Sequence, residues 1–430
     1  MKRHSLFIIC TLLAVAVSCR KKPTIANDDE LARDALYSVM QISYLWNTLM
    51  PEVKREDYPD PYKLLEAMRY KELDRWSYVQ DYGQWQQQSQ AIFVGHGIML
   101  GLDANGRARI AQIYNQSQLY AKGVRRGWIV KTLNGTDLAP VLDDPEAYSS
   151  LMGASQAGIT NTFVFETPEG NSIEIADTKA TFRANTVIHY DTLKLKSGTA
   201  GYLVFEQFEN PSETELERTF AFFSQSNINS IIVDLRYNGG GRLNVLQKLA
   251  THIAGSSYAG KPFLTMTYNE QQKKRNETMP FSAVTASVGV GKMVVITTRG
   301  TASASEDLIN GLKPFMEIKT VGDTTNGKPV GMIGTTFSTK SKGYIYMFWP
   351  ITFTLFNTDG ESDFYEGFAP DKYAIDDITR DWGDRNETCL REAIYILENG
   401  SVSPKGGQGG RQPAILSEGT RQSNAYLIAK

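Results

Sequence analysis

The stretch SIIVDLRYNGGG, residues 230–241, indicates the class of fold more strongly than any other part of the chain. Its first half, Ser230–Leu235, is a short apolar run, which is typical of a strand buried on both faces of a parallel sheet. Three glycines then allow a sharp turn, and the apolar spacing of Leu243–Ile253 predicts a helix directly after it. A buried strand, a glycine turn and a helix in this order predict an α/β core.

Segments on both sides of this stretch repeat the alternation of strand and helix. Two more apolar runs predict buried strands, two segments at helical spacing predict helices, and two later segments look like hairpin strands. The core is therefore expected to span residues 191–400 as a mixed α/β domain. The strands are Gly201–Phe205 and Met293–Thr297, the helices Glu213–Phe223 and Glu387–Glu398, and the hairpin strands Gly343–Phe348 and Ile351–Leu355.

The remaining residues divide into three regions that differ in sequence pattern and composition. A chain of 430 residues is long enough for about three domains. Residues 31–90 place apolar side chains at helical spacing, which predicts an N-terminal helical region. Residues 91–190 consist of short alternating runs with glycine and asparagine turns, which predicts a small β-rich domain. Residues 401–430 are rich in glycine, glutamine, serine and proline and are expected to form a flexible tail.

The first 30 residues have the arrangement of a secretory signal followed by a polar tether. Met1–Arg3 is basic, Leu6–Ser18 is a nearly apolar run of 13 residues, and small residues precede Cys19. We expect a signal peptide at residues 1–18 and a polar tether at 19–30. Because Ala16–Cys19 resembles a bacterial lipobox, Cys19 is the expected site of lipidation. The alternative is ordinary signal cleavage with Cys19 incidental.

Composition excludes several classes of function. The chain has 45 basic and 47 acidic side chains, a net charge of −2, which does not favour a nucleic-acid partner. Cysteine occurs only at Cys10, Cys19 and Cys389, so thiolate metal sites are excluded. No His-x-x-x-His pair supports a metal hydrolase, and a histidine-based triad lacks a matching loop. We expect neither a metal nor a cofactor, and the sequence contains no signal for an oligomeric state.

Two strand ends carry groups suited to acyl-transfer chemistry. After the first strand, the backbone N–H groups of Gly239 and Gly240 can approach a ligand oxygen closely, as in an oxyanion hole or an anion nest. After the strand at Met293–Thr297 comes GTASASE, residues 300–306, in which Ser303 lies at a strand-to-helix junction. A serine on such a turn is exposed like a nucleophile, with the N–H of Ala304 beside it. The alternative is that this serine only caps the helix.

A third segment, GDTTNGKP at residues 322–329, nearly matches a phosphate-binding loop. Pro329 stands where that loop needs a magnesium-binding hydroxyl, and it removes a backbone donor, so a nucleotide site is rejected. Held between Gly327 and Pro329, Lys328 can instead be partly desolvated. Desolvation lowers the pKa of a lysine and lets its neutral amine act as a base.

In this order the three segments resemble the S41 family of serine endopeptidases, the carboxyl-terminal processing and tail-specific proteases. The resemblance implies a ClpP/crotonase-like α/β core that follows a PDZ domain and uses a Ser–Lys dyad. It implies Ser303 as nucleophile, Lys328 as general base, and the backbones of Ala304, Gly239 and Gly240 as oxyanion donors.

Part of the β-rich region resembles a PDZ domain. In that family a Gly-rich loop binds a peptide's terminal carboxylate, and the peptide adds as a strand to the sheet edge. Here the loop would be Gly97, Ile98, Met99 and Leu100, with Met99 in place of a second glycine. The alternative is a β-domain that only packs against the core.

These observations support two functions. The first is a serine endopeptidase, lipid-anchored in the bacterial cell envelope and facing the periplasm or cell exterior, that cleaves unstructured or C-terminal polypeptide segments. The second is a catalytically weak or inactive peptide-binding lipoprotein with the same fold. Many family members have a glutamine four residues after the lysine, where this chain has Met332, which favours the second function. Retention of both Ser303 and Lys328 favours the first.

Overall fold

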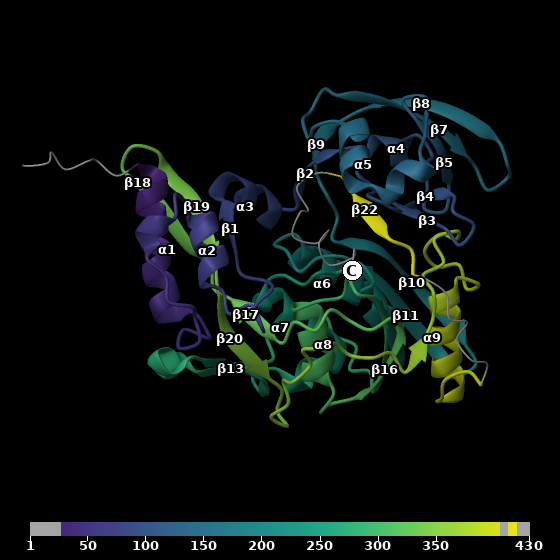
Figure 1. The fold of residues 1–430 in the computed structure, drawn as a ribbon. Coiled ribbons are helices and arrows are strands. Elements are labelled where there is room, and N and C mark those ends of the chain that lie inside the picture. Colours follow the sequence, from purple (N-terminus) through teal and green to yellow (C-terminus); the bar gives the residue numbers. More distant parts are fainter. Residues whose placement is uncertain (1–26, 405–411, 419–430) are drawn as a thin grey trace, which may run out of the picture.

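The computed structural model describes residues 27–404 and 412–418. Its centre is a six-stranded sheet in the order β10-β11-β12-β15-β16-β21, parallel except for the antiparallel edge strand β10 (Figure 1). The predicted mixed α/β core is therefore confirmed. Its strands are β10 (Val187–Leu195), β11 (Gly198–Phe205), β12 (Ser230–Asp234), β15 (Lys292–Thr297), β16 (Glu317–Gly322) and β21 (Lys372–Tyr373). Its helices are α6 (Ser212–Gln225), α7 (Leu243–Ala254), α8 (Ala304–Leu312) and α9 (Thr388–Asn399).

Helices cover both faces of this sheet, which explains why its strands are apolar throughout. Val233 of β12 packs in a core with residues of α6, α7 and α8. Its neighbour Ile232 points to the opposite face, into a second core that includes residues of α9. Successive side chains of a strand point to opposite faces, so both must be apolar when both faces are buried.

The N-terminal region is helical, as predicted, but it also contains a strand of a distant sheet. Strand β1 pairs with β19, and β19 forms a hairpin with β18. The region is thereby fixed to residues more than 250 positions later in the chain. Its elements are α1 (Asp28–Ser43), η1 (Arg55–Asp57), α2 (Pro61–Met68), β1 (Tyr78–Asp81) and α3 (Tyr82–Ser89), with β18 (Thr335–Thr339) and β19 (Gly343–Trp349).

A four-stranded sheet in the order β14-β13-β20-β17 lies beside the core. The two predicted hairpin strands separate here, because β19 joins β18 and β1 whereas β20 pairs with β13 and β17. Pro350, which lacks a backbone donor, stands between them. The strands are β13 (Pro262–Tyr268), β14 (Glu277–Pro280), β17 (Val330–Met332) and β20 (Ile351–Phe356), and short turns are η3 (Ser256–Tyr258) and η4 (Glu270–Arg275).

The β-rich region forms its own sheet, and the C-terminal segment joins it. Strand β22 (Ile415–Ser417) pairs antiparallel with β3, so the predicted flexible tail is wrong for residues 412–418. Ile415 is buried against β3, which no composition-based argument anticipates. The other elements are β2 (Ile92–Gly95), β3 (Ile98–Leu102), β4 (Ala108–Ile113), α4 (Gln118–Ala121), β5 (Ile129–Leu133), β6 (Thr136–Asp137), η2 (Ala139–Asp143), α5 (Pro145–Met152), β7 (Thr160–Glu166), β8 (Ser172–Thr178) and β9 (Ala180–Arg183).

The predicted signal peptide at residues 1–18, Cys19 and most of the tether lie outside the described residues. Within residues 27–404 and 412–418, no helix is both long and apolar enough to cross a membrane.

Candidate active site

The three predicted segments meet at the carboxyl ends of the strands of the central sheet. The glycine turn follows β12, Ser303 follows β15 and Lys328 follows β16, and these parallel strands are neighbours. The carboxyl ends of adjacent parallel strands lie together, which is where ligands bind in open α/β sheets. Ser303, Lys328, Gly239 and Gly240 line one cavity of about 750 Å³.

Ser303 occupies a strained turn between β15 and α8. Its backbone has φ 56° and ψ −122°, a conformation that costs a non-glycine residue about 1–3 kcal/mol. Ser303 is partly exposed, although Ala302 and Ala304 on either side are buried. Ser303 does stand at the N-cap position of α8, but a helix cap needs no such strain. The conformation therefore favours a role in presenting the side chain to the cavity.

One buried carboxylate joins the serine turn to the lysine loop. Glu306 accepts the backbone N–H of Ser303 at 3.0 Å, of Gly327 at 2.6 Å and of Lys328 at 2.8 Å. It also accepts the hydroxyl of Thr325 at 2.6 Å. Glu306 is not among the predicted site residues, although the Ser-x-x-Glu spacing of a capping box is a signal that could have indicated it.

The glycine turn packs directly against the serine turn. Gly240 has φ +96°, and a Cβ there would lie 2.8 Å from the carbonyl oxygen of Ala302. The N–H of Gly240 donates to Oδ1 of Asn238 at 2.9 Å, so the prediction of Gly240 as an oxyanion donor is not supported. The N–H groups of Gly239 and Ala304 donate to no other residue in the described part of the chain. Of the three predicted donors, these two therefore have an N–H without a partner among the described residues.

Lys328 is held in a close-packed loop, with its side chain about nine-tenths buried. Gly327 before it has φ +89°, and a Cβ there would lie 2.1 Å from the carbonyl oxygen of Tyr365. Among the described residues, Nζ of Lys328 has no hydrogen-bond or ion-pair partner. Burial lowers the pKa of Lys328 to about 8, opposed by the carboxylates of Asp307, Asp74 and Glu306. A neutral amine is therefore accessible near physiological pH.

Two acidic residues of the same cavity, Asp307 and Glu209, are not among the predicted site residues. Asp307, one helical turn after Ser303, is buried, and its Oδ1 has no partner among the described residues. Burial raises its pKa well above the usual range. Burial likewise raises the pKa of Glu209 to about 7. Met332, which stands where many family members have a glutamine, also lines the cavity. The charged groups that act on Lys328 are the carboxylates of Asp307, Asp74 and Glu306.

The N-terminal region forms a wall of the cavity and locks the lysine loop. The guanidinium of Arg75 donates to the carbonyl oxygens of Asn326 at 3.0 Å and Tyr365 at 3.2 Å. The aromatic side chains of this wall are Trp76, Tyr78 and Trp85. Its apolar surface is suited to the side chains of an extended peptide.

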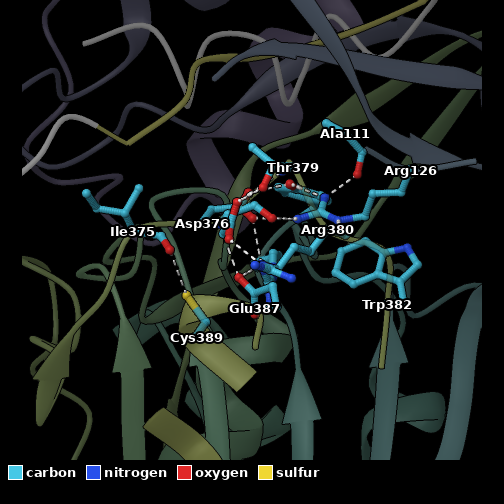
Figure 2. A network of polar contacts seen from close by, with 12 residues as sticks. Ala111, Arg126, Ile375, Asp376, Thr379, Arg380, Trp382, Glu387 and Cys389 are labelled. Carbon is cyan, nitrogen blue, oxygen red and sulfur yellow. Dashed lines mark hydrogen bonds and ion pairs between the residues drawn. The ribbon is translucent and has the colours of Figure 1, made fainter. Parts of the chain in front are cut away.

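A buried ion network connects the glycine turn to the β-rich region (Figure 2). Arg236 pairs with Asp234 at 2.7 Å, Asp376 at 2.6 Å and Glu387 at 3.2 Å. Arg126, from the loop before β5, reaches Asp376 at 2.7 Å. Removing one partner of a buried pair leaves an uncompensated charge, which typically costs about 3–5 kcal/mol. The network therefore fixes the backbone that leads into Gly239.

The residues predicted to bind a peptide lie outside this cavity. Gly97 precedes β3, and Ile98, Met99 and Leu100 belong to it. Gly97, Ile98 and Met99 line a second, much smaller cavity, and Phe93 lines both. None of the three described histidines (His96, His189 and His252) lines the cavity of Ser303.

Comparison with known proteins places these features in a family. The profile of peptidase family S41 matches residues 199–374, and that of the peptidase S41 N-terminal domain matches residues 32–78. The carboxy-terminal processing protease CtpB of Bacillus subtilis is 27% identical over 135 residues, which are 31% of this chain and 26% of that protein. The carboxyl-terminal-processing protease of Picosynechococcus sp. is 27% identical over 194 residues, 45% of this chain and 43% of that protein. The chain thus matches less than half the length of either relative.

A solved structure extends the likeness in fold beyond the core. A protein of Bacteroides fragilis NCTC 9343, assigned to the S41 proteases, superposes with a TM-score of 0.68 at 21% identity. The superposition covers 84% of this chain and 96% of that one. The likeness in fold therefore extends over most of this chain and nearly all of the other protein.

Proposed function

Since the chain belongs to peptidase family S41, we propose that it is a serine endopeptidase that cleaves unstructured or C-terminal polypeptide segments. The observation that carries the proposal is the strained Ser303 in the same cavity as the desolvated Lys328. A protein that only binds peptides needs neither a strained serine nor a buried, unpaired lysine.

In the proposed reaction, Oγ of Ser303 attacks the scissile carbonyl carbon and forms a tetrahedral intermediate. Neutral Lys328 takes the hydroxyl proton and returns it to the leaving amine when the carbon–nitrogen bond breaks. The N–H groups of Gly239 and Ala304 stabilise the negative oxygen. Water then attacks the acyl-enzyme, with Lys328 again as the base, and releases the second fragment.

The substrate class is tested with one polypeptide in two states. We expect a reduced and alkylated polypeptide to be cut into fragments detectable by mass spectrometry, because an extended chain fits the aromatic wall of the cavity. The same polypeptide with its disulfides intact and its fold retained should remain whole. Failure to cut either form would instead support the peptide-binding alternative.

The rate should depend on pH through Lys328. Its neutral form is the base, so kcat/KM should rise about tenfold per pH unit below the pKa of about 8 and level off above it. At pH 7 that pKa leaves about one molecule in eleven neutral, against about one in 2,500 for an ordinary lysine. Rates are measured with a short peptide ester between about pH 6 and 10.

Glu209→Gln is the control for this profile, because Glu209 is the other group of the cavity with a pKa near neutrality. The midpoint of the pH profile of kcat/KM for Glu209→Gln should remain near that of the wild type. A profile that is flat below pH 8, or whose midpoint moves with Glu209, would contradict the role of Lys328.

We also propose that the protein is anchored in a bacterial cell envelope through a lipid on Cys19, with its body facing the periplasm or cell exterior. The basic start, the apolar run and the small residues before Cys19 support the proposal. In membrane fractionation, Cys19→Ala should move most of the protein to the soluble fraction. Cys10→Ala, a change inside the apolar run, should leave the protein with the membranes. Equal membrane retention of both variants would contradict a lipid anchor on Cys19.

A further inference from the structure

The C-terminal segment occupies the edge of the β-rich sheet. In the strand order β22-β3-β4-β5-β7-β8, the segment 415–417 is the outermost strand, and β3 would be the edge without it. The antiparallel register pairs Ile415 with Gly101, Leu416 with Leu100 and Ser417 with Met99. An unpaired strand edge is the surface to which an extended peptide adds. The edge that carries the predicted peptide-binding residues is therefore filled by the chain's own backbone (Figure 1).

The residue after this strand places a carboxylate in the loop before β3. Oε2 of Glu418 accepts the backbone N–H of His96 at 2.7 Å. A Cβ on Gly95 would lie 2.7 Å from the same oxygen, so the loop approaches the carboxylate through bare backbone. The side chains of His96 and Lys179 and the N–H of Ile98 also act favourably on its charge, although burial raises the pKa of Glu418 overall. The loop thus has the chemistry of a carboxylate-binding site.

Two further contacts hold the segment in place. Ile415 is buried in a cluster with Met99, Ala111 and Ile378. The side chain of Gln412 accepts the N–H of Asp376 at 2.9 Å and donates to the carbonyl oxygen of Ala374 at 2.8 Å. The segment is therefore held by strand pairing, by an apolar anchor and by polar contacts at both of its ends.

We propose that residues 412–418 are a built-in ligand of this edge, with the Glu418 carboxylate in the position that the terminal carboxylate of an incoming peptide would take. A polypeptide can then bind β3 only by displacing the segment. The proposal deepens the proposed peptidase function, because the competing peptide would be the terminus of a substrate. The segment belongs to the same chain, so its effective concentration at this edge exceeds that of a free peptide at ordinary concentrations. The apparent dissociation constant for any external peptide is then the intrinsic constant divided by the fraction of time that the edge is free.

The test measures binding in full-length Ser303→Ala protein, which prevents cleavage of the probe. The probe is a heptapeptide with the sequence of residues 412–418, an N-terminal fluorescein and a free C-terminal carboxylate, followed by fluorescence anisotropy. Adding Glu418→Gln removes the internal charge and should tighten probe binding by about tenfold or more. Adding Ile415→Asp, which puts a charge into the apolar cluster, should do the same by releasing the strand.

Glu174→Gln is the matched control, because Glu174 is an exposed glutamate on β8 of the same sheet. It should leave the affinity unchanged. Equal probe affinity in the parent and in both tail variants, whether strong or undetectable, would overturn the proposal. Loss of the peptidase proposal would appear separately, as failure of the wild-type chain to cut a polypeptide, and would leave the binding result intact.

Discussion

Ser303→Ala is expected to lower kcat/KM for an unfolded polypeptide by about 10⁴-fold or more. The other two hydroxyls of this turn, those of Thr301 and Ser305, are buried and donate to backbone carbonyl oxygens, whereas Ser303 lines the cavity. Without the Ser303 hydroxyl, water would have to act as the nucleophile in place of the serine. The residual rate would come from the oxyanion donors and from substrate binding alone. Cleavage is followed by mass spectrometry and, for kcat and KM, with a fluorogenic peptide.

Stability should separate this loss from unfolding. Alanine adopts the φ of 56° at about the same cost as serine, so the melting temperature of Ser303→Ala should stay within a few degrees of the wild type. Ser224→Ala, at an exposed serine near the end of α6, should keep full activity. A Ser303→Ala protein that folds and still cleaves within tenfold of the wild-type rate would show that the nucleophile is another residue.

Lys328→Ala is expected to cause a loss of the same size, on the order of 10⁴-fold, because the serine hydroxyl then has no base to accept its proton. Lys328→Arg should fail as well, since a guanidinium does not deprotonate in this pH range. The Ser303→Ala, Lys328→Ala double variant should lose little more than either single variant, because the two residues act as a unit. Single-turnover rates with a peptide ester would measure the chemical step directly.

Lys340→Ala is the matched control, since Lys340 is exposed in the turn between β18 and β19 and does not line the cavity of Ser303. It should be fully active. If Lys328→Ala kept near-wild-type rates, the base would be sought among the other titratable residues of the cavity, Asp307 and Glu209. The histidines would not be candidates, because none of the described ones lines the cavity.

The core and the two residues on which the proposed chemistry depends could be predicted from the sequence. Residues 230–235 could be assigned to a buried strand because burial on both faces requires an uninterrupted apolar run. Ser303 follows such a strand, but β16, which precedes Lys328, is not an uninterrupted apolar run and was not predicted. The expectation that Ser303 and Lys328 lie together came from the family resemblance, and the structure explains it, because the carboxyl ends of the neighbouring parallel strands β15 and β16 meet in space. Neither the local pattern nor the resemblance separates Gly239 from Gly240, which depends on a side-chain contact of Asn238.

The surroundings of these residues depend on contacts between distant parts of the chain. Glu306 bonds to two adjacent residues of one loop, 21 and 22 positions further along the chain, and Arg75 bonds to the same loop from about 250 residues away. The desolvation that lowers the pKa of Lys328 arises from the packing of several elements and not from its own loop. Strand β22 lies in a segment whose composition predicts flexibility. A strand of three residues gains its stability from the sheet edge to which it adds, so composition alone could not predict it. Sequence patterns report periodicity and local propensity, whereas burial, long-range hydrogen bonds and edge pairing exist only once distant segments have been brought into contact.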